Sequence, residues 1–399
     1  MSSGTQTRTG YLMATACAGL FTFGVMTSFL GAILPELSSR LSFSLSRSGT
    51  LFSFLYLPQV PMVFLAGPLI DRFGKKPILV LGFFFSAVAL VGMAYVPSYT
   101  LLGLLLVLLG LGGSSAMSAS NTLIPDLYPS NPSSAFNLAN IFFGVGAIFF
   151  PGLVELMTAR FGLVATLWLI AALVLLVAGV ALAQKFPPAA LVSGFNSAQA
   201  LRVAIDPAVI LLGCVLFFYS TLEISTAGWI RTYLERELSA LPQNSQHVYT
   251  LFWIMMMVGR LATSQIVKKV RASRIVLVAS LGAFAGLVIM AVAPSIWVAA
   301  AGIVLCGLAY APVFPNTAGT ASTYFARLFG TVFGMLMTLA LLSGAVIPPL
   351  IGYVAERSSV RTGIWMLVVA AILLFITQAV FVQYERRRFL RSSSAGAST

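Results

Sequence analysis

The chain has 399 residues, of which 59% are hydrophobic and only 8% are charged, and its mean hydropathy is +0.98. Apolar runs of about membrane-spanning length repeat from one end to the other, because a bilayer core needs roughly 20 apolar helical residues per span. These values exclude a soluble protein and indicate a polytopic membrane protein, in which the few polar groups within the spans become functional candidates.

Twelve apolar segments are predicted to cross the membrane as helices, which gives an all-α membrane fold. They lie at 10–35, 48–70, 77–96, 99–125, 135–158, 163–183, 207–234, 247–267, 273–293, 295–322, 329–350 and 362–383. The first is too long for a cleavable signal peptide and lacks a cleavage site, so we expect it to remain as a helix. All three cysteines fall inside spans and are expected to be packing residues.

The chain has a net charge of +13. Its basic residues are distributed as the predicted membrane topology requires and do not indicate a nucleic-acid-binding patch. Fifteen basic residues fall on the side of the N-terminus: Arg8, Arg72, Lys75, Lys76, Lys185, Arg202, Lys268, Lys269, Arg271, Arg274, Arg327, Arg386, Arg387, Arg388 and Arg391. Seven fall on the other side: Arg40, Arg47, Arg160, Arg231, Arg236, Arg357 and Arg361. Positive residues favour the cytoplasmic side, so both termini are predicted to be cytoplasmic, in a bacterial inner (plasma) membrane.

The spans form an internal repeat. The polar break at 184–206 divides them six and six, and segments of the two halves match at offsets of 195 to 198 residues. The matches are 27–34 with 224–231, 67–82 with 264–279, Asn121 with Asn316, and 145–153 with 343–351. We therefore predict a first six-helix bundle at 1–183, a cytoplasmic linker at 184–206, a second bundle at 207–385 and a basic tail at 386–399. Such a repeat is typical of a transporter whose site lies between the halves.

Glu223 is the leading candidate site residue because it lies well within the seventh span. An ionised carboxylate at that depth costs at least ~2.5 kcal/mol, so it is expected to face a cavity, pair with a base or be protonated. The functional interpretation is solute binding, proton coupling or both; the alternative is a structural hydrogen bond between helices. Arg260, toward the end of the eighth span, is expected to be structural or gating, and Arg231 an interfacial anchor.

Several uncharged side chains are further candidates for binding a polar solute. Asn121, Asn140 and Asn316 can donate and accept hydrogen bonds, as sugar hydroxyls require, although amides also join membrane helices. Gln59 and Tyr219 are weaker candidates of the same kind. Trp229 and Trp253 can stack on the apolar face of a sugar ring, with packing as the alternative.

Catalytic and cofactor-binding patterns are not found in the sequence. It contains no Walker loop, nucleophile elbow, HExxH motif or cysteine pair, and its one histidine cannot form a metal site alone. We therefore expect neither an enzyme nor a bound cofactor or metal.

The segment GPLIDRFGKK at 67–76 joins two spans on the predicted cytoplasmic side. With twelve spans and the repeat, the chain resembles the major facilitator superfamily over nearly its whole length. That resemblance implies a cytoplasmic gate formed by Gly67, Asp71, Arg72, Gly74, Lys75 and Lys76.

A finer resemblance is to the fucose–glucose–hexose symporter branch. It rests on the segments 23–37, 137–152, 219–234, 252–261 and 306–319. It implies sugar contacts from Asn137 or Asn140 and an acid at Glu223. The chain departs from that branch because its first span has no acid before Glu36 and its fourth has none before Asp126.

Together these features predict a secondary transporter that moves a monosaccharide or related polyol by alternating access. Glu223 is the candidate coupling acid, with a proton or sodium ion as partner, and we expect a monomer among membrane lipids. The alternative is an exporter of hydrophobic or cationic compounds. A hypothesis from a different functional class is a non-transporting receptor or a lipid-modifying enzyme.

Overall fold

In the computed structural model, every element of the described residues is an α-helix, which confirms the all-α class. The structure describes residues 3–128, 132–187, 202–267, 269–325 and 328–396. The first half contains α1 (Ser3–Leu41), α2 (Leu45–Tyr56), α3 (Gln59–Phe73), α4 (Lys75–Ala94), α5 (Tyr99–Leu127) and α6 (Pro132–Ala183). The second contains α8 (Pro207–Glu237), α9 (Pro242–Ile266), α10 (Ala272–Val292), α11 (Ile296–Tyr310), α12 (Val313–Tyr324), α13 (Phe329–Arg357) and α14 (Val360–Gly396).

Eleven helical segments of the described residues are long and apolar enough to cross a membrane. The remaining predicted span, 247–267, corresponds to α9, which has 25 residues and packs against α6, α8 and α11. A helix of that length extends about 37 Å. Polar residues such as Gln246 and Arg260 lower the mean hydropathy of α9. They are tolerated within the helix because they face the interior of the bundle and not lipid.

Proline and glycine account for the places where predicted spans and observed helices differ. The second span is divided into α2 and α3 at Pro58, and the tenth into α11 and α12 at Pro312. Proline has no N–H to donate, so the helical hydrogen-bond ladder is interrupted there. The fifth and sixth spans are joined within α6 and separate at Gly162, whose φ of 76° is a left-handed conformation that glycine adopts without a Cβ clash.

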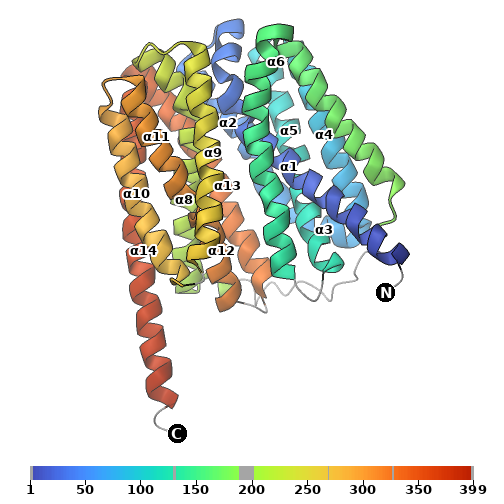
Figure 1. Cartoon of the computed structure of the whole chain (residues 1–399), viewed down its shortest axis with the longest axis vertical. Helices are drawn as coiled ribbons and strands as arrows, with labels where there is room; N and C mark the ends of the chain where they lie inside the picture. The colour runs from blue at the N-terminus through green and yellow to red at the C-terminus, as the bar shows by residue number, and fades with distance from the viewer. Residues whose placement is uncertain (1–2, 129–131, 188–201, 268, 326–327, 397–399) are drawn as a thin grey trace.

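The two halves repeat each other closely in helix position. The helices α2, α4, α5 and α6 each begin 197 residues before α9, α10, α11 and α13, respectively. Between the halves, α1 contacts α8, α2 contacts α13 and α6 contacts α9 (Figure 1). The repeat relates α2 to α9 and α6 to α13. It therefore converts the α2–α13 contact into the α6–α9 contact. This is the pseudo-symmetric arrangement of two bundles that the sequence repeat predicts.

Both chain ends lie at the same end of the bundle, and the last helix, α14, extends beyond it (Figure 1). We call this end the termini face and the other end the opposite face. Helices α1 and α8 both run from the termini face to the opposite face. Residues near their C-terminal ends, such as Glu36 and Arg231, therefore lie toward the opposite face.

Candidate functional site

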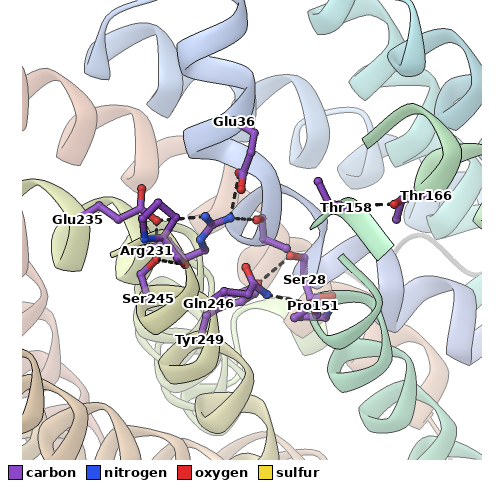
Figure 2. Close-up of polar contacts among 12 residues, drawn as sticks. Ser28, Glu36, Pro151, Thr158, Thr166, Arg231, Glu235, Ser245, Gln246 and Tyr249 are labelled. Carbon is purple, nitrogen blue, oxygen red and sulfur yellow. Dashed lines mark hydrogen bonds and ion pairs between the residues drawn. The ribbon is translucent and has the colours of Figure 1, made fainter. Parts of the chain in front are cut away.

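An ion pair joins the two halves near the opposite face. Arg231 of α8 is only 2% exposed, and its Nη1 donates to a Glu36 carboxylate oxygen of α1 at 2.9 Å and to the Ala32 carbonyl. Its Nη2 donates to Glu235 at 3.1 Å, and Ser245 donates to the same Glu235 oxygen at 2.5 Å. Figure 2 shows Arg231 between the two carboxylates. The expected interfacial anchor is therefore a buried contact between halves.

Further polar contacts cross between the halves around this ion pair. Tyr249 donates to the Ser28 carbonyl at 2.7 Å, and Gln246 donates to the Pro151 carbonyl at 2.9 Å (Figure 2). On the α2–α13 side, Ser53 donates to the Ala345 carbonyl at 2.5 Å. These contacts link α1, α2 and α6 to α8, α9 and α13, so the halves are closed together at the opposite face.

Glycine permits close backbone approach between α2 and α13 within this closure. A Cβ built on Gly49 of α2 would lie 2.6 Å from the Pro348 carbonyl oxygen and 2.8 Å from the Pro349 Cα of α13. Cβ atoms essentially never lie within 3.0 Å of another heavy atom in this way. The closed arrangement therefore depends on the absence of a side chain at this position, as in other small-residue contacts between membrane helices.

A cavity of about 100 Å³ lies between the halves, on the termini side of the Arg231 contacts. Glu223, in its wall, precedes Arg231 by eight residues, which is about 12 Å along α8. Both halves contribute to the wall. Its residues are Leu20, Phe23, Thr27, Tyr56, Met117, Asn121, Asn140 and Phe143 from the first half, and Tyr219, Ser220, Glu223, Ile224, Arg260, Phe314, Phe333, Met337, Ala340 and Leu341 from the second.

Glu223 and Arg260 form the charged part of this wall. Glu223 is 9% exposed, and its Oε1 lies 4.0 Å from the Arg260 Nη2. That separation is beyond hydrogen-bond distance, so the two charges attract without contact. The Arg260 guanidinium also lies over the Phe143 ring of the other half, 5.3 Å from its centroid. Opposite charges thus face one cavity with space between them.

Several buried polar atoms of the wall make no hydrogen bond of normal geometry within the described part of the protein. They are the Asn121 Oδ1, the Tyr219 hydroxyl, the Glu223 Oε1 and the Arg260 Nε. Tyr219 lies one helical turn before Glu223, on the same face of α8, and is in electrostatic contact with Glu223 and Arg260. Buried polar groups are usually paired, and leaving one unpaired costs about 1–3 kcal/mol. The arrangement can therefore satisfy a polar solute that brings both donors and acceptors.

Four of the predicted binding residues are brought together in this wall: Glu223, Asn121, Asn140 and Tyr219. Four others do not line it. The Asn316 amide donates to the Pro312 carbonyl at 2.7 Å, and the Gln59 amide donates to the Leu55 carbonyl at 3.0 Å. Each serves its own helix near a proline break.

Trp229 and Trp253 are also outside the cavity wall. Trp229 is fully buried, and Trp253 is 2% exposed and packs on Tyr249 and Phe252. The side chain of Asn137 lies outside the described residues. The roles of these residues in binding stay predictions.

The predicted gate segment lies at the termini face. Gly74 adopts a φ of 84° between α3 and α4, Lys75 pairs with Asp126 of α5, and Lys76 donates to the Gln184 carbonyl at 2.9 Å. Arg72 is exposed and lies over the Phe73 ring. These contacts lie within the first half and the first residue of the predicted linker, and the side chain of Asp71 lies outside the described residues. Gly67 is part of α3. Gating by this segment stays a prediction.

Two features of the site were not predicted from the sequence. Arg260 was assigned a structural or gating role, yet it faces the cavity, and the only signal was a cation inside the run FWIMMMVGRL. Four phenylalanines are part of the apolar wall: Phe23, Phe143, Phe314 and Phe333. With 30 phenylalanines in the chain, composition alone does not distinguish these four. Among the described residues, no group of three or more His, Cys, Asp or Glu is placed to hold a metal ion.

A helical membrane bundle with an internal repeat and, between its halves, a cavity with an apolar wall and a few buried polar groups is the architecture of a membrane transporter. The family model of the Major Facilitator Superfamily matches residues 16–340 and 212–397, so the chain belongs to that superfamily. This confirms the family expected from the repeat and the loop motif.

Relatives in sequence are distant. A protein TsgA homolog of Buchnera aphidicola subsp. Schizaphis graminum is 23% identical over 246 residues, which is 61% of this chain and 63% of the relative. The match thus spans less than two thirds of that relative's length. An uncharacterized MFS-type transporter, YfkL of Bacillus subtilis, is 34% identical over 90 residues, 23% of each chain.

Solved structures share the fold over nearly the whole chain. A D-xylose-proton symporter superposes with a TM-score of 0.80 at 14% identity, covering 94% of this chain and 97% of that one. The nucleoside transporter NupG gives 0.77 at 15% identity, with 93% and 99% covered. The E. coli fucose:proton symporter FucP gives 0.67 at 18% identity, with 92% and 98% covered. At such identities the likeness concerns the fold.

Proposed function

We propose that this transporter moves a small polar solute, a monosaccharide or related polyol, by alternating access, with Glu223 as the binding or coupling acid. The observation that carries the proposal is the set of unpaired buried polar atoms around the cavity between the halves. A sugar brings many hydroxyls, each of which donates and accepts. The phenylalanine walls suit the apolar faces of a sugar ring, as ligand pockets combine apolar walls with a few oriented polar groups.

The closure at the opposite face supports alternating access. The Arg231–Glu36 pair joins the halves in this state, and rocking of one bundle against the other would separate it and expose the cavity to the other side. In that second state the segment 67–76, with Asp71 and its basic neighbours, would close the termini face. By the positive-inside rule the termini face is cytoplasmic, in a bacterial inner membrane. Because one chain forms the whole cavity, we propose a monomer as the working unit.

The second candidate is export of hydrophobic or cationic compounds. Its support is a carboxylate in an aromatic cavity, which can hold a cation. Against it, the Arg260 guanidinium lies 4.0 Å from Glu223 in the same wall and would repel a positively charged compound. We therefore prefer the sugar or polyol as the solute.

Transport by the purified full-length chain in liposomes tests the proposal. Labelled D-glucose, D-xylose, D-glucitol and a lipophilic cation would each be offered, with and without an imposed proton or sodium gradient. Saturable uptake or counterflow of a sugar or polyol is the expected result. Movement of the lipophilic cation alone would replace the proposal with the exporter.

A further inference from the structure

Resting on the proposed function, we propose that Arg260 is the anchor for a carboxylate on the solute, so that the preferred solutes are acidic sugars, uronic or aldonic acids, carried together with one proton on Glu223. This names the substrate class of the cavity described above and assigns Arg260 a binding role.

The contacts of Arg260 leave donors for a ligand. Its ion pair with Glu223 is at 4.0 Å, Tyr219 lies beside it, its Nε makes no hydrogen bond of normal geometry among the described residues, and one face of the guanidinium is covered by Phe143. Its side chain is only 21% exposed. A guanidinium has five donors in a planar fork that matches a carboxylate in bidentate fashion. A cation held by an aromatic ring, with its edge facing a cavity, is thus placed for an anion.

A neutral sugar would leave this arrangement poorly satisfied. Hydroxyl oxygens can accept from the guanidinium, but they add no charge, so Glu223 and Arg260 would stay attracted across their gap. A carboxylate inserted beside Arg260 forms charge-assisted hydrogen bonds, which are roughly twice as strong as neutral ones. The remaining hydroxyls of a sugar acid would then reach Asn121 and Tyr219.

Charge balance explains why a proton would accompany the acid. Glu223 is faced by Arg260 from α9, Tyr219 from its own helix, Tyr56 from α2 and Tyr310 from α11. The tyrosines carry no charge, so the negative charge of Glu223 is balanced by the positive charge of Arg260 alone. An entering carboxylate adds one negative charge in a low-dielectric site, and a proton taken from water by the Glu223 carboxylate restores the balance. Binding of anion and proton therefore favour each other, and both leave on the release side.

The test uses the purified full-length chain with D-glucuronate and D-gluconate against D-glucose. Affinity would be measured at two pH values, and proton uptake on binding would be followed with an indicator in weak buffer. We expect about one proton per bound D-glucuronate in the wild type. Arg260→Gln should weaken D-glucuronate binding at least about tenfold and leave D-glucose binding within about threefold. Glu223→Gln should bind D-glucuronate with no proton uptake and no pH dependence.

Two further variants keep the test independent of misfolding. Arg260→Lys retains the charge without the fork and should bind D-glucuronate more weakly than the wild type and more tightly than Arg260→Gln. Arg357→Gln removes an exposed arginine that lies over Tyr353, and it should leave affinity and proton uptake unchanged.

The outcomes separate this inference from the proposed function. Binding and transport of D-glucose without binding of either sugar acid would overturn the inference and leave the proposed function standing. Binding of D-glucuronate without proton uptake would also overturn it. Transport of the lipophilic cation, with no sugar or sugar acid bound, would overturn both.

Discussion

The Arg231 guanidinium of α8 lies 2.9 Å from the Glu36 carboxylate of α1, although the two residues belong to different halves. Arg231 is buried and also pairs with Glu235 of its own helix. Glu36 is 34% exposed, so water compensates part of its charge, and removing Arg231 costs less than the ~3–5 kcal/mol of a fully buried pair. This contact therefore contributes to the free-energy difference between the state closed at the opposite face and the state open there.

Replacing Arg231 should shift the protein toward opening at the opposite face. In Arg231→Met, Glu36 and Glu235 lose their shared cation, so the closed state is destabilised. A cysteine placed at Thr27 in the cavity wall would report this shift. Its labelling by a membrane-impermeant maleimide applied at the opposite face should rise at least about tenfold.

Native cysteines would first be replaced in that experiment, since Cys214 is only partly buried. Arg357→Met is the matched control, because Arg357 is exposed. Equal labelling in Arg231→Met and the control would show that the ion pair does not hold the face closed.

A methyl group at Gly49 should oppose the same closure by a steric route. In Gly49→Ala the Cβ would lie 2.6 Å from the Pro348 carbonyl oxygen, and overpacking of this kind costs about 1–3 kcal/mol. We expect the transport rate to fall about five- to a hundredfold in liposomes. Gly179→Ala is the control, because nothing lies within 4 Å of its added Cβ. An unchanged rate in Gly49→Ala would refute a rate-limiting role for the α2–α13 contact.

Asn121 and Asn316 match in the sequence repeat at an offset of 195 residues, but they should respond differently to substitution. Asn121 lines the cavity with an unpaired Oδ1, so Asn121→Ala should weaken solute binding by about 1–2 kcal/mol, roughly five- to thirtyfold. The Asn316 amide is used by the Pro312 carbonyl, so Asn316→Ala should lower thermal stability with little effect on affinity. Isothermal titration and thermal unfolding of both variants check this, and the reverse pattern would contradict the site.

Span positions were predictable because hydropathy measures transfer from water to lipid, which the fold must satisfy for each helix. The repeat was predictable from sequence matches at offsets of 195 to 198 residues. In the structure, corresponding helices begin 197 residues apart. Glu223 was found for the same reason, since a carboxylate at membrane depth needs an explanation.

The direction in which each side chain points was not predictable in the same way. Helices that are apolar on all sides carry no amphipathic stripe, so Trp229 and Phe143 look alike in the sequence although only Phe143 faces the cavity. The burial of Arg231 depends on Glu36, which lies 195 residues away. The binding role of Asn316 was expected from the repeat, but the break at Pro312 gives its amide a backbone partner.

The most direct test of the central claim, that Glu223 couples solute movement to a proton, is to measure proton-driven accumulation in the Glu223→Gln variant. Wild type and variant would be reconstituted in liposomes with labelled D-glucose and D-glucuronate, and both accumulation against a gradient and equilibrium exchange would be measured. The account predicts that the variant exchanges the solute that the wild type accumulates but no longer concentrates it. Accumulation by Glu223→Gln to the wild-type level would contradict the account.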